Sequence, residues 1–176
     1  MHHSVQRPRR LRANPAIRNM VQEHRLHPHD FIAPLFIVDG NDIKQEIESM
    51  PDYFRYSLDR LTEELEELVA LDIQSVLLFV KVPDHLKDNE GKEALNVDGL
   101  MQRSIRFIKE EFPQLYVMTD IALDPYSSFG HDGIVEDGEI INDRTVEVLA
   151  RMSVSHAQAG ADMVAPSDMM DGRVGA

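Results

Sequence analysis

The chain has 176 residues, of which 43% are apolar and 28% are charged, and it contains no cysteine. That length suits one domain with a sizeable core, and the apolar content is too high for intrinsic disorder. The lack of cysteine excludes disulfides, thiolate nucleophiles and every cysteine-ligated zinc or iron–sulfur site. No apolar run approaches the ~18 residues of a membrane helix, so we expect no membrane partner and a cytoplasmic protein.

The net charge of −13 is distributed unevenly along the chain. Residues 1–25 hold six arginines and one acid, Glu23, which gives this segment a charge of +5 and leaves −18 on the remainder. So acidic a body repels phosphate and argues against nucleic-acid binding, although the segment Arg7–Arg12 could bind nucleic acid as a tail. A basic arm on an acidic body more economically predicts docking onto an acidic face of a neighbouring subunit, and therefore a homo-oligomer.

Residues 1–30 are predicted to form an N-terminal arm with one short helix. Asn14 suits the N-cap of that helix, and Pro15 suits its first position, where a missing N–H costs nothing. The helix should run to about Leu26 and stop before Pro28, because the residue ahead of a proline disfavours helix. Residues 31–176 are expected to form the domain that follows the arm.

Short apolar runs in this domain predict four buried strands, at residues 33–38, 75–80, 115–118 and 162–166. Amphipathic helices are expected between them, with N-caps at Ser57, Asp98 and Asn142 and with Gly160 ending the last helix. Continuous apolar strands that alternate with such helices predict an α/β fold with a parallel sheet. A doubly wound sheet and a (β/α)8 barrel both fit, and no Gly-x-Gly-x-x-Gly pattern follows any strand to favour a dinucleotide site.

Only residues 167–176 follow the fourth predicted strand, so the helix that should cover it is missing or barely begun. A parallel strand without its crossover helix leaves an apolar face and an unpaired edge in water. We therefore expect this chain to form about half of a larger domain.

The segment 120–133 is the first candidate site, because ligands of parallel α/β folds bind at the carboxyl ends of the strands. It contains three carboxylates, two hydroxyls, a phenol and an imidazole. Hard oxygen donors suit Mg²⁺, and carboxylates could equally hold a substrate ammonium through charge-assisted hydrogen bonds. The alternative is a turn-rich loop in which Asp and Gly serve backbone geometry.

Two further features carry candidate chemistry. The segment 166–173 follows the fourth strand and contains Ser167 and Asp168, although Asp168, Asp171 and Arg173 could simply form an ion-pair network that sets a turn. Lys81 ends the second strand, where a desolvated lysine would have the lowered pKa that Schiff-base chemistry needs. Alternation along the strand could equally turn Lys81 toward solvent.

The segments 120–134 and 164–173 resemble the porphobilinogen synthase (5-aminolevulinate dehydratase) family. The run Pro166–Arg173, with the sequence Pro-Ser-Asp-Met-Met-Asp-Gly-Arg, is a very specific match, and residues 7–12 and 34–36 are similar to the start of that family. The resemblance covers essentially the whole chain. It implies a (β/α)8 TIM barrel, here only about its first four βα units, together with an N-terminal arm.

The resemblance also implies an activity, the condensation of two 5-aminolevulinate molecules to porphobilinogen with loss of two waters, early in heme and other tetrapyrrole synthesis. Two lysines of the family form Schiff bases with the substrate ketones. Both lysines, the arginines that hold substrate carboxylates and an allosteric magnesium site lie after the segment that matches Pro166–Arg173. On this basis the chain alone is expected to be inactive, and Lys81 matches neither lysine.

Zinc-dependent members of the family carry three cysteines at the positions of Ala122, Asp124 and Asp132. The chain is therefore similar to the cysteine-free, aspartate-rich type, which implies Mg²⁺ or K⁺ rather than catalytic zinc. Phe129 departs from the family, since many members have histidine there. The family also forms large homo-oligomers, commonly octamers, in which the arm embraces a neighbour.

Together these inferences predict that one pocket binds 5-aminolevulinate through Asp120, Asp124, Asp132, Ser167 and Asp168. Asp124 and Asp132 are the candidates for holding a metal ion or the substrate amino group. Two alternatives remain: a non-catalytic fragment that docks onto full-length subunits, and another βα-barrel lyase that forms its imine on Lys81.

Overall fold

Four parallel strands form the centre of the fold, in the positions that the apolar runs predict. In the computed structural model, which describes residues 6–176, they are β1 (Ile32–Val38), β4 (Ser75–Lys81), β5 (Tyr116–Ile121) and β8 (Met163–Pro166). They are hydrogen-bonded side by side in the order β1-β4-β5-β8, and every pair is parallel. The strands form a parallel sheet with helices between them, so the predicted α/β fold class is confirmed.

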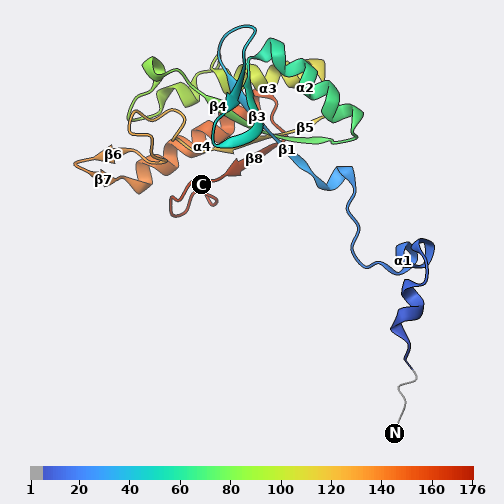
Figure 1. The fold of residues 1–176 in the computed structure, drawn as a ribbon. Coiled ribbons are helices and arrows are strands. Elements are labelled where there is room, and N and C mark those ends of the chain that lie inside the picture. The colour runs from blue at the N-terminus through green and yellow to red at the C-terminus, as the bar shows by residue number, and fades with distance from the viewer. Residues whose placement is uncertain (1–5) are drawn as a thin grey trace.

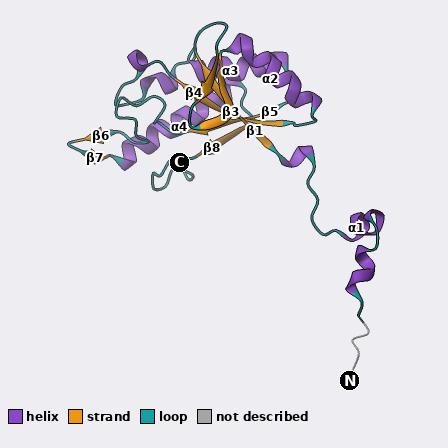
Figure 2. Cartoon of the chain, in the orientation of Figure 1, coloured by secondary structure: helices purple, strands orange, loops and turns teal. Residues whose placement is uncertain are grey.

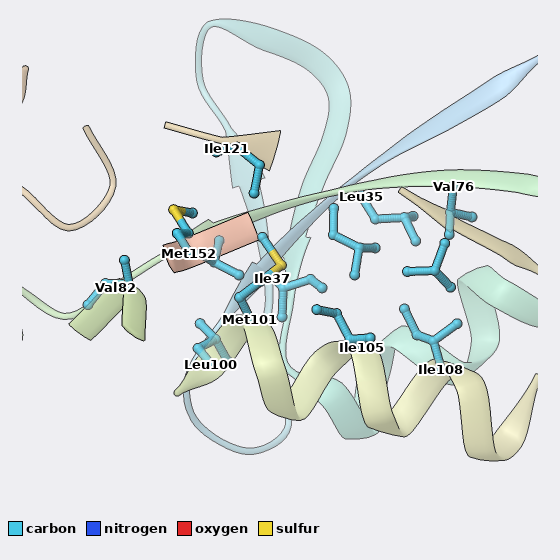
Figure 3. Packing of buried hydrophobic residues seen from close by; sticks show 14 of the residues in the cluster. Leu35, Ile37, Val76, Val82, Leu100, Met101, Ile105, Ile108, Ile121 and Met152 are labelled. Atoms are coloured by element: carbon cyan, nitrogen blue, oxygen red, sulfur yellow. The ribbon is translucent and has the colours of Figure 1, made fainter. Parts of the chain in front are cut away.

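Three long helices connect these strands and cover one face of the sheet (Figures 1 and 2): α2 (Leu58–Ala70), α3 (Leu100–Glu111) and α4 (Asn142–Ala159). The leucines spaced three and four residues apart in α2 are buried, as an amphipathic helix requires. Figure 3 shows Met101, Ile105 and Ile108 of α3 pointing at side chains of the sheet such as Leu35 and Val76. Burial of these apolar side chains is the main force that holds the helices on the sheet.

The structure extends β5 further than the sequence predicted. The predicted strand ended at Met118, whereas β5 continues to Ile121, and Asp120 pairs with Ala165 of β8. The predicted strand was too short because its last part contains the polar residues Thr119 and Asp120. Alternation along the strand turns the Thr119 side chain toward the helices and the Asp120 side chain toward the opposite face. Asp120 is thus held by the sheet and does not belong to the loop after it.

A β-hairpin that the sequence analysis missed extends the sheet at its other edge. β2 (Lys44–Ile47) and β3 (Met50–Tyr56) are antiparallel, and β3 pairs with β1 only through Arg55 and Tyr56. Both strands are largely exposed and rich in polar residues, so no continuous apolar run marks them. The order of the whole sheet is β2-β3-β1-β4-β5-β8.

The remaining elements are short. A second hairpin consists of β6 (Val135–Glu136) and β7 (Glu139–Ile140). The 3-10 turns are η1 (Pro8–Arg12), η2 (Pro28–Asp30), η3 (Asp84–Leu86) and η4 (Lys92–Leu95), and the arm also contains the helix α1 (Pro15–Val21).

The helix ends correct four details of the prediction. α1 begins at the predicted Asn14 cap but ends at Val21 rather than near Leu26, because the chain turns to an extended conformation at Gln22. α3 is capped by Gly99 instead of Asp98, and α4 starts one residue earlier than predicted, at Asn142 itself, with Ile141 as its N-cap. Ser57 occupies the N-cap of α2, yet its hydroxyl bonds to the backbone of Ile43 and caps no helix N–H. The cap at Gly160 is confirmed, with a φ of 109°.

The arm extends away from the rest of the molecule (Figure 1). None of the residues of η1, α1 or η2 is buried, and the large apolar side chains of Leu11, Met20 and Leu26 are exposed. Its end is tied to the body, where Nε2 of His29 lies 2.9 Å from a carboxylate oxygen of Asp72. A short helix without tertiary contacts is only marginally stable by itself. We therefore expect this arm to pack against another surface.

The edge at β8 is open, as the sequence predicted. Within residues 6–176, only turns follow β8 and no strand pairs with its outer edge. A groove of about 710 Å³ lies beside it, lined largely by apolar side chains of α4, β8 and the last residues, among them Leu149, Val154, Val164, Pro166 and Val174. None of the described helices is long and apolar enough to cross a membrane.

Candidate functional site

A cavity of about 540 Å³ opens at the carboxyl ends of the strands, where the sequence analysis expected a site. It joins residues that are far apart in the chain, because the ends of β1, β3, β4, β5 and β8 meet at this side of the sheet. Its polar lining combines carboxylates, cations and a hydroxyl from these elements and the loops after them: Arg55, Lys81, Lys87, Asp120, Asp124, Asp132 and Ser167.

Two aromatic rings form the apolar part of the lining. Phe36 of β1 and Phe79 of β4 are direct neighbours in the sheet, and their rings stack with centroids 5.2 Å apart at an interplanar angle of 17°. Tyr53 meets the edge of Phe36 at 6.2 Å. The cavity therefore has an apolar wall beside its charged groups, which is typical of small-molecule sites.

Asp120 and Ser167 form the tightest polar contact in the cavity. The last residues of β5 and β8 pair in register, Ile121 with Pro166, so Ser167 emerges beside Asp120. The Ser167 hydroxyl donates a hydrogen bond of 2.5 Å to Oδ1 of Asp120. Burial raises the pKa of the Asp120 carboxyl, the charges of Asp132 and Asp168 raise it further, and the bond from Ser167 opposes both effects.

Asp124 lies three residues after the end of β5. Loss of water around its carboxylate raises the pKa of Asp124 to about 6, and the neighbouring charges of Asp132 and Asp120 add to the rise. Lys87 acts in the opposite direction. Three like charges converge here, and a carboxylate in such surroundings is suited either to moving a proton near neutral pH or to receiving a cation.

Asp168 lies behind the cavity and does not line it. Its side chain is fully buried, with Oδ1 accepting a 2.7 Å hydrogen bond from the backbone N–H of Met170 and Oδ2 lying 3.2 Å from Nε of Arg173. Arg173 also donates to the carbonyl of Met170. The local contacts thus match the turn-setting ion pair that the sequence analysis held as its alternative, and Asp168 influences the cavity through its charge on Asp120.

Lys81 lines the cavity together with the predicted site residues. It lies at the end of β4 on the face of the sheet away from the helices, the same face that carries Phe79. Its side chain is exposed within the described chain, whereas the flanking Val80 and Val82 are buried. The described residues therefore do not supply the burial that the imine alternative needs.

No group of three or more histidine, aspartate or glutamate side chains within residues 6–176 is arranged to hold a metal ion. Asp124 and Asp132 line the same cavity, and their charges act on each other. The metal role of these two residues thus stays a prediction.

Several cavity residues lie outside the segments that the sequence marked as candidate sites. Lys87, in the loop after β4, lines the cavity and pairs with Asp84 at 2.9 Å. Arg55 comes from the hairpin that was not predicted. Phe36 and Phe79 lie in predicted strands whose apolar residues were all expected to be part of the hydrophobic core. None of these residues belongs to a pattern that marks a site before the strands are placed side by side.

A parallel α/β sheet with an acidic cavity at the carboxyl ends of its strands defines the chain as part of an α/β protein of the barrel type. A model of the Delta-aminolevulinic acid dehydratase family matches residues 5–176, and the chain belongs to this family. It is 49% identical to the Delta-aminolevulinic acid dehydratase of Chlamydia pneumoniae over 96% of this chain and 51% of that protein. The corresponding protein of Bacillus subtilis (strain 168) is also 49% identical, over 99% of this chain and 53% of the relative.

A solved structure agrees with this assignment. The crystal structure of delta-aminolevulinic acid dehydratase (porphobilinogen synthase) from Toxoplasma gondii ME49, in complex with the reaction product porphobilinogen, superposes with a TM-score of 0.91 at 47% identity. The match covers 96% of this chain and 48% of that one. The chain thus spans about half the length of these relatives, and its sheet corresponds to part of their fold.

Proposed function

We propose that these residues form the first half of the (β/α)8 barrel of a porphobilinogen synthase, which condenses two molecules of 5-aminolevulinate with loss of two waters. The observation that carries the proposal is the cavity in which the Asp120–Ser167 pair faces the carboxylates of Asp124 and Asp132. Family membership and the open edge of β8 support it, because a half barrel needs further strands to close.

In this proposal the carboxylates hold the substrate amino group. 5-Aminolevulinate carries an ammonium group, and the raised pKa of Asp124 indicates negative charge that lacks a counter-charge. An ammonium placed between Asp124 and Asp132 would supply one and would lower the pKa of Asp124. The apolar rings of Phe36 and Phe79 would pack against the carbon chain of the substrate.

Asp120 and Ser167 are proposed to handle protons. Their hydrogen bond of 2.5 Å gives a carboxyl and a hydroxyl that can exchange a proton with a bound substrate while staying in place. The condensation itself needs amines that form imines with the substrate ketones, and Lys81 matches neither of the two lysines that the family resemblance implies. We therefore propose that the residues of this chain bind and orient substrate and that the imine-forming lysines come from outside them.

A hard cation fits the same carboxylates. Mg²⁺ is commonly held by one or two carboxylates and keeps several of its waters, which suits Asp124 and Asp132 better than a closed cage of protein ligands would. Catalytic zinc fits less well, because the cavity lining offers neither a thiolate nor an imidazole. When bound, Mg²⁺ or K⁺ would neutralise the cluster and orient the amino end of the substrate.

The N-terminal arm is proposed to bind a second subunit. It is basic, it exposes Leu11, Met20 and Leu26, and none of the residues of its elements η1, α1 and η2 is buried. A non-catalytic role is the second candidate, since the apolar groove beside α4 and β8 and the free edge of β8 would also allow the chain to dock onto longer subunits.

Binding of 5-aminolevulinate and of levulinate to this chain tests the proposed role of the carboxylates. The two molecules share the ketone and the carboxylate, and only the first has the amino group. We expect 5-aminolevulinate, but not levulinate, to shift the carboxyl NMR signals of Asp124 and Asp132. Equal shifts with both compounds would show that the carboxylates do not recognise the amino group.

A further inference from the structure

Two asparagines, Asn89 and Asn142, each hold one loop of the cavity by the same pattern of two hydrogen bonds to a single backbone residue. The amide of Asn89 donates to the carbonyl of Val135 at 2.9 Å and accepts from the N–H of the same residue at 3.0 Å. The amide of Asn142 donates to the carbonyl of Asp171 at 3.1 Å and accepts from its N–H at 2.8 Å. Each asparagine side chain thus makes, with one backbone residue, the two hydrogen bonds that a neighbouring strand would make in a sheet.

Asp88 and Asn89 together form a clamp, by which we mean the hydrogen bonds that join the loop after β4 to the loop after β5. The N–H of Asp88 donates to the carbonyl of Tyr126, and the carbonyl of Asp88 accepts from the N–H of Ser128. Consecutive residues of the loop after β4 therefore grip the loop after β5 at two points, before and after the segment 129–134. Asp132 lies within this segment and has no strand or helix of its own to hold it.

The clamp opposes an electrostatic force. Asp132 lines the same cavity as Asp120 and Asp124, so its charge is repelled by both carboxylates. A loop that carries one of three converging charges moves outward unless something restrains it. The two hydrogen bonds between Asn89 and Val135, three residues from Asp132, supply such a restraint.

Asn142 acts on the other side of the cavity. It is the first residue of α4, and Asp171 lies four residues after Ser167 in the turn that follows β8. The bonds tie this turn to a helix that is packed on the sheet. Without them, the turn is held by the buried contacts of Asp168 and Arg173.

We propose that Asn89 and Asn142 are positioning residues, the first holding Asp132 next to Asp124 and the second holding Ser167 next to Asp120. The proposal rests on the proposed function only in taking these four residues as the site. Neither asparagine lines the cavity, so each acts through the loop that it holds.

Alanine variants of this chain test the two clamps separately. In Asn89→Ala we expect amide hydrogen exchange at Val135 to become at least about tenfold faster, because two hydrogen bonds are lost, while exchange at Asp171 stays unchanged. The carboxyl NMR signal of Asp132 should shift as this residue moves away from Asp124. In Asn142→Ala the exchange at Asp171 should accelerate and the carboxyl NMR signal of Asp120 should shift as Ser167 moves away from it, while the signal of Asp132 stays the same.

Asn96→Ala is the matched control, since this exposed asparagine of the same loop bonds only within its own turn. It should change neither exchange at Val135 nor the carboxyl NMR signal of Asp132. An Asn89→Ala variant that is folded, yet keeps the Asp132 signal of the parent chain, would overturn the proposal. So would an equal shift of this signal in Asn96→Ala.

If Asn89→Ala does not fold, Asn89→Ser is the second variant. Its shorter side chain cannot make both hydrogen bonds with Val135, so the same shift of the Asp132 signal is expected from it. Neither readout requires substrate or turnover. A failure of 5-aminolevulinate to bind would therefore count against the proposed function and leave the result for the two clamps unaffected.

Discussion

The hydroxyl of Ser167 donates a 2.5 Å hydrogen bond to Oδ1 of Asp120 and so joins the turn after β8 to the end of β5. The two residues are 47 positions apart in the chain, and the parallel pairing of β5 with β8 brings them together. We expect Ser167→Ala to raise the pKa of Asp120 further, since a hydrogen bond to the charged form is lost.

A carboxyl NMR titration of the Ser167→Ala variant checks this prediction. Ser128→Ala is a suitable control, because its hydroxyl makes no hydrogen bond within the described chain. An unchanged pKa of Asp120 in the Ser167 variant would show that the bond does not form in solution.

Binding of Mg²⁺ should weaken as the pH falls through the pKa of Asp124. This carboxyl ionises near pH 6, and its protonated form offers no charge to a cation. Calorimetric titrations with MgCl₂ at pH 5 and pH 8 should therefore differ by about tenfold or more in affinity, and Asp124→Asn should remove most of the dependence. Equal affinities at the two pH values would rule out Asp124 as a ligand.

The same substitution predicts a change in stability of known sign. The pKa of Asp124 is higher in the folded than in the unfolded chain, so the folded state gains from its protonation and loses stability as the pH rises from about 4 through 6. Asp124→Asn should therefore increase the free energy of unfolding at pH 8, by about 1 kcal/mol after allowing for its contact with solvent, and should add little at pH 4. Urea unfolding at both pH values measures this difference.

Lys87→Met should move the ionisation of Asp124 to higher pH. Lys87 lowers the pKa of Asp124, and the methionine keeps most of the side-chain volume without the charge. Lys92→Met is the control, because Lys92 pairs only with Asp88 and Glu90 on the exposed side of the same loop. A shift of equal size in both variants would mean that overall charge, and not the position of Lys87, sets the pKa.

His156 should make the domain sensitive to acid. It is buried in α4 with Nδ1 3.0 Å from Oγ1 of Thr119, and burial lowers its pKa to about 4. A lowered histidine pKa costs stability as the pH falls from about 6.5 to 4, because the unfolded chain takes up the proton more readily. We expect a loss of about 3 kcal/mol over this range, opposite in sign to the contribution of Asp124.

Unfolding measurements on His156→Leu separate this contribution, since the variant cannot take up that proton. Its stability should vary less between pH 6.5 and pH 4 than that of the parent chain. His85→Gln, which changes an exposed histidine, should keep the parent's dependence on pH. The account of His156 is wrong if the two variants behave alike.

The sequence predicted the parts of the fold that rest on local apolar patterns. The strands around Leu35, Leu78 and Val164 were found because buried parallel strands are continuously apolar. The hairpin of Lys44–Tyr56 was not found, because its strands lie at an edge, where polar residues are tolerated. The end of β5 was missed for a related reason, since Asp120 faces the cavity and Thr119 bonds to His156.

The location of the candidate site was predicted more accurately than the contacts within it. That Asp120, Asp124, Asp132 and Ser167 line one cavity follows from the rule that the ends of parallel strands meet. The burial of Asp168 could not be predicted, because it depends on Arg173 folding back over it. Asn142 was expected to cap a helix and instead holds a loop, a choice that only the tertiary structure decides.

Reconstitution with the second half of a relative tests the central claim most directly. This chain would be mixed with the C-terminal half of the Bacillus subtilis protein, and formation of porphobilinogen from 5-aminolevulinate would be measured, with the two halves of the Bacillus subtilis protein as the positive control. The account predicts that neither half is active alone, that the mixture forms porphobilinogen, and that Asp124→Ala lowers its rate at least about tenfold. An inactive mixture beside an active control would contradict the claim that these residues supply half of the synthase site.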